Sequence, residues 1–216
     1  GSGFIYSSDG YILTNFHVIE SASSIKVTLY DGTSYDAKLV GYDESNDIAV
    51  LKIDAADLTP VVLGDSDTLN VGDSVVAIGN PLGEQLRWTM TNGIISAINR
   101  DLTVNDRTMN LIQTNAALNN GNSGGPLFDM NGNIIGVTTA KVSGTTDSGV
   151  SIEGLGFAIP INDAIKVAQE LLENGYVTGR PYLGITYLAV TDAQTASQLG
   201  VNAYGVYVVE VVKGGD

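Results

Sequence analysis

The sequence predicts an all-β domain followed by a shorter second unit. Up to about residue 160 it consists of short apolar or alternating segments rich in Val, Ile and Thr, residue types that suit a pleated surface. Turn signals separate the segments, because glycine accepts positive φ after an acidic or amide residue; they are Asp9-Gly10, Asp31-Gly32 and Asn131-Gly132. Many short strands at this spacing predict a β-barrel or β-sandwich.

The expected strands follow in order along the chain, each bounded by turn residues. They cover residues 11–14, 25–30, 48–53, 74–78, 94–98 and 134–138. Residues 162–174 differ, since their apolar side chains recur with a helical period. We expect Asn162 to cap this helix and Gly175 to follow its last turn; the apolar positions are Ile165, Ala168, Leu171 and Leu172.

A linker over residues 178–181 leads to the second unit. There we expect a turn and strand from Tyr182, a short helix over 193–199 and a strand over 206–212. So few residues rarely form an independent domain, and we expect the chain to end inside its second domain. Residues 1–5 resemble a strand already under way, which leaves a preceding segment open.

Composition excludes several classes of function. The hydrophobic fraction of 44% is enough for a buried core, and the net charge of −14 argues against binding to nucleic acid or anionic lipid. No cysteine and a single histidine exclude disulfides, cysteine redox chemistry and a multi-histidine zinc site. We expect neither a metal nor a cofactor. No apolar run reaches the roughly 18 residues that cross a bilayer.

The run Gly121-Asn122-Ser123-Gly124-Gly125-Pro126 is typical of a nucleophilic serine on a tight turn. Serine needs a base to take its proton and a third group to orient that base. His17 must be the base, because the chain has no other imidazole. In such a turn the backbone N–H groups of Gly121 and Ser123 can converge on an oxyanion, each donor contributing about 100- to 1,000-fold in rate.

Two other hydrolase templates fail. The esterase nucleophile elbow requires the histidine after the serine and a helix after the turn, whereas Pro126 leads into a predicted hairpin. The subtilisin order requires an acid before the histidine, and only Asp9, in a predicted turn, qualifies. The remaining order is histidine, aspartate, serine. Asp47 is the best acid, because it precedes a buried run; Asp31, Asp36, Asp43 and Asp54 are weaker.

Three segments resemble the motifs of the HtrA/Deg family of trypsin-like serine proteases. They are Thr14-Asn15-Phe16-His17-Val18-Ile19, Asn46-Asp47-Ile48-Ala49-Val50-Leu51-Lys52 and Gly121-Asn122-Ser123-Gly124-Gly125-Pro126-Leu127. The resemblance implies a chymotrypsin/trypsin-like double six-stranded β-barrel with a C-terminal helix over residues 1–177, its first strand preceding Gly1. It also implies that 178–216 form a linker and the N-terminal part of a PDZ domain.

The resemblance also assigns roles to individual residues. It implies a catalytic triad of His17, Asp47 and Ser123, and an oxyanion hole made by the backbone of Gly121, Asn122 and Ser123. The substrate pocket would be lined by Leu118, Thr139, Ala140 and Lys141, with Thr139 bonding Asp47. Because no acidic residue falls at the pocket base, we expect cleavage after small or medium aliphatic residues. The PDZ carboxylate loop would be Tyr182, Leu183, Gly184 and Ile185.

The chain departs from the family pattern at Phe16, Asn115 and Asn120. Asn122 stands where digestive trypsin-like enzymes have an aspartate that pairs with a newly cut N-terminus. Asparagine cannot form that ion pair, so we expect activity to be switched by loop rearrangement.

The leading functional prediction is an endopeptidase that acts on unfolded proteins in envelope quality control. Its alternatives are a chaperone-like or peptide-binding module with a dormant proteolytic site, and an esterase of small acyl substrates. The resemblance further implies a homotrimer, peptide C-termini as PDZ ligands and an extracytoplasmic location in a bacterial envelope, with no nucleic-acid partner.

Overall fold

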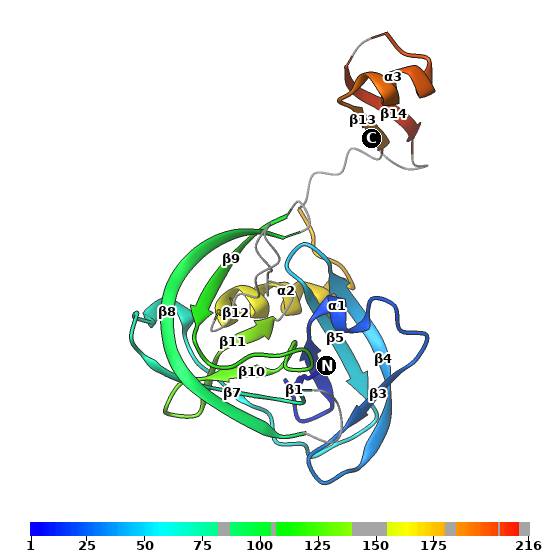
Figure 1. The fold of residues 1–216 in the computed structure, drawn as a ribbon. Helices are drawn as coiled ribbons and strands as arrows, with labels where there is room; N and C mark the ends of the chain where they lie inside the picture. Colours follow the sequence, from blue (N-terminus) through cyan, green and yellow to red (C-terminus); the bar gives the residue numbers. More distant parts are fainter. Residues whose placement is uncertain (82–86, 105–106, 140–154, 180–184, 203, 212–216) are drawn as a thin grey trace. The chain divides into compact units, whose positions relative to one another are not determined.

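The computed structural model describes residues 1–81, 87–104, 107–139, 155–179, 185–202 and 204–211 of the 216. The chain divides into two compact units, Gly1–Val177 and Thr178–Asp216. Each unit is built mainly of antiparallel strands (Figure 1).

The first sheet of the larger unit has five described strands in the order β1-β2-β5-β4-β3, all antiparallel. The sheet is centred on β5, which pairs with β2 and β4, and the first three residues of β5 are fully buried. Gly10 and Gly32 make the hairpin turns at φ 103° and 87°, as their turn signals predicted. The strands are β1 (Phe4–Ile5), β2 (Tyr11–Thr14), β3 (Ile25–Thr28), β4 (Ser34–Asp43) and β5 (Ile48–Ile53).

The second sheet closes on itself. Its strand order is β10-β7-β8-β9-β12-β11-β6, and β10 also pairs with β11, which completes a six-stranded ring. β6 adds to the outside of this ring, parallel to β11. The strands are β6 (Val62–Leu63), β7 (Ser74–Gly79), β8 (Thr89–Val104), β9 (Arg107–Thr114), β10 (Pro126–Phe128), β11 (Asn133–Thr139) and β12 (Gly156–Pro160).

The double-barrel fold class expected from the sequence is therefore confirmed, with one difference in strand count. The second sheet contains the expected six-stranded barrel, whereas the first has five described strands and no described pairing between its edges β1 and β3. Several strands also differ in length from the prediction: β8 extends far beyond 94–98, and β3 ends at Thr28.

Helix α2 (Ile161–Asn174) packs against strands of both sheets, among them β11 and β4. Gly175 ends it in the left-handed conformation and donates to the Leu171 carbonyl, as predicted. The predicted N-cap is wrong: Pro160 occupies that position. The Asn162 side chain instead donates to Asp65 and accepts from the Ser66 N–H at the short 3₁₀ turn η1 (Ser66–Thr68).

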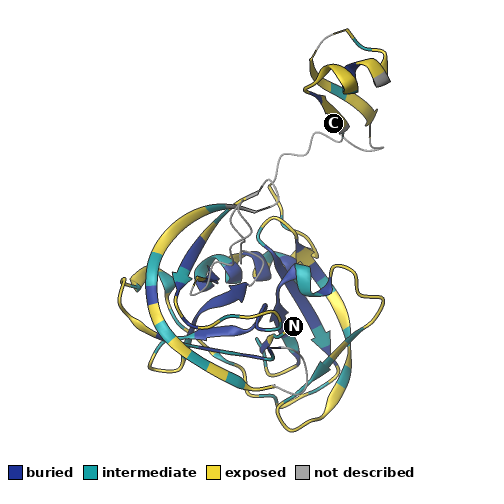
Figure 2. Cartoon of the chain, viewed as in Figure 1, coloured by how far each residue is buried: buried dark blue, intermediate teal, exposed yellow. Residues whose placement is uncertain are grey.

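Buried residues of the larger unit lie along the strands and α2 (Figure 2). Their side chains form three clusters that hold the unit together. One lies within each sheet, and the third joins both sheets to α2. This shared cluster combines Leu13 and Val50 of the first sheet, Val137 and Ile159 of the second, and Leu171 of the helix. The two sheets are thus fixed to each other mainly by burial of aliphatic side chains.

The smaller unit contains β13 (Ile185–Val190), α3 (Ala193–Leu199) and β14 (Gly205–Val211). β13 and β14 form an antiparallel pair. The Asp192 side chain accepts from the Thr195 N–H at 2.8 Å and caps α3. Of the predicted carboxylate loop, Ile185 begins β13, while Tyr182, Leu183 and Gly184 lie outside the described residues. In the described part of the chain, no helix has the length and apolar character needed to span a bilayer.

Candidate active site

His17 and Asp47 are brought together by one pair of strands. β2 and β5 are antiparallel, with Thr14 opposite Ala49, so the end of β2 lies beside the start of β5. The chain leaves β2 through Asn15 and enters the one-turn helix α1 (Phe16–Ile19), which carries His17. Asp47 directly precedes β5. The register of this pair therefore sets the base beside the acid.

Two hydrogen bonds join His17 to the Asp47 carboxylate. Asp47 Oδ2 lies 2.7 Å from His17 Nδ1, and Asp47 Oδ1 accepts from the His17 backbone N–H at 2.9 Å. The Asp47 side chain is only 3% exposed, whereas that of His17 is 20% exposed. A buried carboxylate in low dielectric interacts strongly with an imidazolium. It also favours the tautomer in which Nε2 is free to take a proton.

Asp47 adopts a backbone conformation that needs support. Its φ is +54°, in the left-handed region that aspartate tolerates better than most residues. Its carbonyl accepts from the Phe16 N–H at 3.2 Å and from Asn15 Nδ2 at 2.9 Å. Asp43 holds the preceding turn by accepting from the Asn46 N–H and side chain.

The Asn15 side chain contacts the backbone of Asp47, which the sequence analysis did not anticipate. It stands at the N-cap position of α1, but its side chain makes no cap bond and binds the carbonyl of Asp47 instead. Its Oδ1 is buried without a hydrogen-bond partner in the structure. Only its place beside His17 in the motif could have drawn attention to it.

The Ser123 loop belongs to the second sheet and lies against the segment that leads to His17. Ser123 is 4% exposed, and Gly121 and Gly124 have φ of 108° and 84°. A Cβ on Gly124 would lie 2.3 Å from Thr14 Oγ1 and 2.9 Å from the backbone N of Asn15. Only glycine permits both this φ and this approach. The structure thus packs the serine loop directly onto the strand end that precedes the base.

In the predicted oxyanion loop, the backbone N–H of Asn122 donates to the Asn119 carbonyl at 3.0 Å and closes a turn. Asn122 is buried, and its Oδ1 has no hydrogen-bond partner in the structure. It packs on Gly79, where a Cβ would lie 2.6 Å from that oxygen. Gly79, at the end of β7, is a second residue that sequence reasoning missed.

Two of the four predicted pocket residues fall in the described part of the chain. Thr139 Oγ1 lies 3.4 Å from Asp47 Oδ2, at the place where we expected it to bond the acid. Leu118 is half-buried and packs on the second-sheet core and on Gly156, so a core role is as well supported as a pocket role. Ala140 and Lys141 lie outside the described residues.

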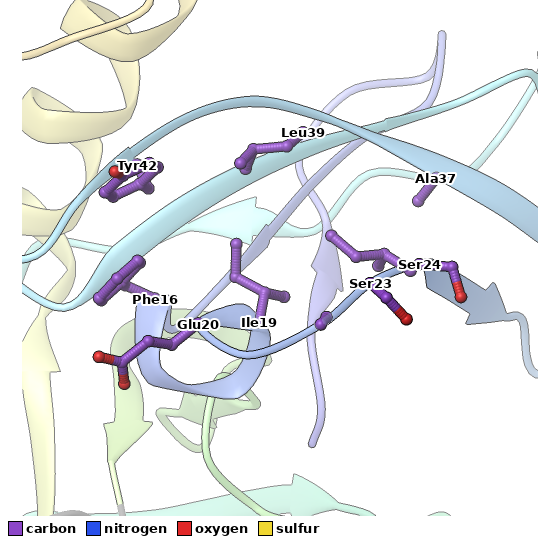
Figure 3. A pocket seen from close by; sticks show the side chains of 10 residues that line it. Phe16, Ile19, Glu20, Ser23, Ser24, Ala37, Leu39 and Tyr42 are labelled. Atoms are coloured by element: carbon purple, nitrogen blue, oxygen red, sulfur yellow. The ribbon is translucent and has the colours of Figure 1, made fainter.

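The departures at Phe16 and Asn115 have local structural reasons. Phe16 stacks on Tyr42 of β4, with ring centroids 4.6 Å apart. Asn115 accepts from the Ile94 N–H at 2.8 Å. Beside this stacked pair is a cavity of about 350 Å³ between α1 and β4, and Phe16, Ile19, Leu39 and Tyr42 are among the residues that line it (Figure 3). His17 is not among its lining residues.

A double barrel with a histidine and a buried aspartate in contact, and a serine loop from the other sheet packed beside them, is the architecture of trypsin-like serine peptidases. The family model described as "Trypsin-like peptidase domain" matches residues 1–137.

Relatives and solved structures of similar sequence narrow the class of peptidase. The chain is 43% identical to "Serine protease Do-like HtrA" of Bacillus subtilis, covering 99% of this chain and 50% of that protein. It is 48% identical to "Probable periplasmic serine endoprotease DegP-like" of Chlamydia trachomatis, covering 99% and 42%. The structure "HtrA-type protease AlgW with decapeptide" is 44% identical at a TM-score of 0.75, covering 100% of this chain and 64% of that one.

The chain therefore belongs to the HtrA-type family of trypsin-like serine proteases. It spans about half the length of the curated relatives it matches.

Proposed function

We propose that this chain is the proteolytic part of a serine endopeptidase that cleaves unfolded polypeptides. The observation that carries the proposal is the 2.7 Å contact between His17 Nδ1 and the buried Asp47 carboxylate, with the glycine-framed Ser123 packed on the same strand end. The naming of relatives as serine proteases supports it.

The proposed reaction follows from these groups. Ser123 Oγ attacks the scissile carbonyl while His17 Nε2 takes its proton, and Asp47 stabilises the imidazolium that results. The backbone N–H groups of Gly121 and Ser123 bind the oxyanion. When the C–N bond breaks, His17 gives the proton to the departing amine and an acyl-enzyme remains. Water activated by His17 then releases the acid and restores the hydroxyl.

The test compares wild type, Ser123→Ala and Ser66→Ala on unfolded casein. Ser66 is a half-buried serine at η1 that, like Ser123, lies in a backbone turn, so its variant controls for loss of a hydroxyl as such. We expect the first variant to lose all turnover above background and the control to keep it. Equal degradation by wild type and Ser123→Ala would exclude a serine protease.

The same proteins distinguish the alternatives. An esterase would turn over short acyl esters and no peptides. A dormant, chaperone-like module would suppress aggregation of an unfolded protein equally with and without Ser123, and would release no fragments.

We further propose that cleavage follows small or medium aliphatic residues such as Val or Ala. Leu118 is apolar and half-buried, and the predicted pocket contains no carboxylate to bind a basic side chain. A peptide library should therefore give a profile dominated by aliphatic residues before the cut. A profile dominated by Lys or Arg would contradict this assignment.

We propose that no N-terminal cleavage is required for activity. The Asn122 side chain is a neutral amide packed on Gly79, and a neutral amide forms no ion pair with a new amino terminus. Protein synthesised and purified without any proteolytic step should be active. An absolute requirement for N-terminal processing would refute the idea.

The wider setting is proposed from the family. We propose that residues 1–177 are the protease domain and that 178–216 belong to a linker and a PDZ domain that binds peptide C-termini. We also propose a homotrimer acting in protein quality control outside the cytoplasm; the names of the chlamydial relatives, which include "periplasmic", support that location. Light scattering of the purified protein tests the trimer, and fractionation of cells tests the location.

A further inference from the structure

Ser2 joins three segments around the serine loop. Its backbone N–H donates to the Ser123 carbonyl at 2.8 Å, and its carbonyl accepts from Thr14 Oγ1 at 2.6 Å. Its hydroxyl donates to the Gly121 carbonyl at 2.7 Å and accepts from the Asn80 N–H at 3.0 Å. One residue thus contacts both ends of the loop that carries the nucleophile.

The side-chain and backbone bonds of Ser2 have separate roles. Any residue except proline, which lacks an N–H, would supply the backbone bonds to Ser123 and Thr14. The Ser2 hydroxyl donates to one carbonyl and accepts from an N–H through a single oxygen atom, and both distances are typical of good hydrogen bonds. An alanine at position 2 therefore removes the bridge between Gly121 and Asn80 and leaves the rest in place.

The Gly121 carbonyl belongs to the peptide that lies between the two proposed oxyanion donors. Gly121 has φ 108°, and glycine imposes little torsional restraint of its own, so contacts must define where this peptide points. An oxyanion donor is effective only when it lies about 2.7–3.1 Å from the developing charge. A hydrogen bond from the Ser2 hydroxyl to the Gly121 carbonyl restricts the orientation of this peptide without contacting the substrate.

We propose that Ser2 is a positioning residue of the oxyanion hole. Its hydroxyl binds the Gly121 carbonyl and the Asn80 N–H and so holds the Ser123 loop in the geometry that stabilises the transition state. The inference rests on the proposed endopeptidase function. It goes further, because it assigns a catalytic contribution to a residue that lies far in sequence from the nucleophile.

The test is Ser2→Ala, with Ser66→Ala as the matched control. The Ser66 hydroxyl also accepts from a distant backbone N–H, that of Asn162, at 3.2 Å, and it is half-buried like Ser2. Rates are measured on an aliphatic peptide per active site, counted by titration with a fluorophosphonate, and below the melting temperature of each variant. Unfolded molecules are therefore left out of the rate.

We expect Ser2→Ala to lower kcat by about 10- to 100-fold, the range for a displaced catalytic group, with KM unchanged within about threefold, because only transition-state binding is affected. A peptide boronate ending in valine should bind more weakly by the same factor as kcat/KM. Ser66→Ala should match wild type in both.

A normal kcat per active site for Ser2→Ala would overturn the inference. A loss confined to the number of titratable sites would also overturn it, since that result means a purely structural tie. If wild type itself proves inactive beside Ser123→Ala, the proposed function fails, and the inference fails with it. Active wild type with unaffected Ser2→Ala refutes the inference alone.

Discussion

Gly79→Ala should damage stability and activity together, and the structure gives the reason. A Cβ at this position would lie 2.6 Å from Asn122 Oδ1 and 2.8 Å from Asn122 Cα. Gly79 is not among the residues with positive φ, so alanine can adopt its backbone conformation. The loss of stability therefore comes from the clash with Asn122 alone. Because one contact is to the backbone of a buried residue, the loop must move.

The expected magnitude follows from the cost of overpacking. An extra methyl in a tightly packed site costs about 1–3 kcal/mol, which lowers the melting temperature of a unit this size by roughly 2–12 °C. Displacing the residue next to the nucleophile should also reduce kcat by about 10- to 100-fold. Thermal unfolding by circular dichroism and peptide cleavage per titrated site measure the two effects.

Gly64→Ala is the matched control for this experiment. A Cβ there would lie 3.0 Å from the Ile134 carbonyl oxygen and 3.1 Å from Ile135 Cγ2, so it is also crowded, but against β11. We expect a loss of stability near the lower end of the range with kcat unchanged. Unaltered melting and kcat for Gly79→Ala, or an equal loss of kcat in both variants, would refute the reasoning.

Three more variants test other parts of the structure. Asp47→Asn should keep the fold, since asparagine tolerates the same φ, but lower kcat by about 10⁴-fold in peptide assays; a loss below tenfold would contradict the triad. The Asn162 side chain and the Asp67 N–H hold the pKa of Asp65 below its usual 3.8, so its stabilisation is present above that pH and is lost as the pH falls. Asp65→Ala should melt below wild type at pH 7, and the gap should shrink below pH 4; a constant gap in melting scans would oppose this. Gly41→Ala would place a Cβ 2.6 Å from the Gly175 carbonyl oxygen and should reduce the free energy of unfolding by about 1–3 kcal/mol, measured by urea denaturation. An unchanged urea curve would contradict this expectation.

Local sequence patterns were sufficient for much of the fold. β2, β5 and α3 have the predicted bounds, because short apolar runs between turn residues are local signals. The preference for Asp47 over Asp43 rested on the buried strand that follows it, and the structure places Asp47, not Asp43, against His17. Asp43 instead binds the turn at Asn46.

Long-range contacts explain what the sequence left out. Ser2 and Gly79 act through Gly121 and Asn122, more than forty residues away, and no local pattern encodes such partners. Asn162 was expected to cap its own helix, but its side-chain amide donates a hydrogen bond to Asp65, which is distant in sequence.

The proton-accepting pair and the nucleophile are anchored on different sheets. β2 and β5 place His17 beside Asp47, whereas Ser123 belongs to the closed sheet. The two sheets are joined by the aliphatic cluster around α2. A small shift of one sheet relative to the other would therefore move Ser123 away from the His17 imidazole and leave the contact between His17 and Asp47 unchanged. In the proposed protease, the rate of catalysis would therefore depend on how the two sheets fit together, with no change to any reacting group.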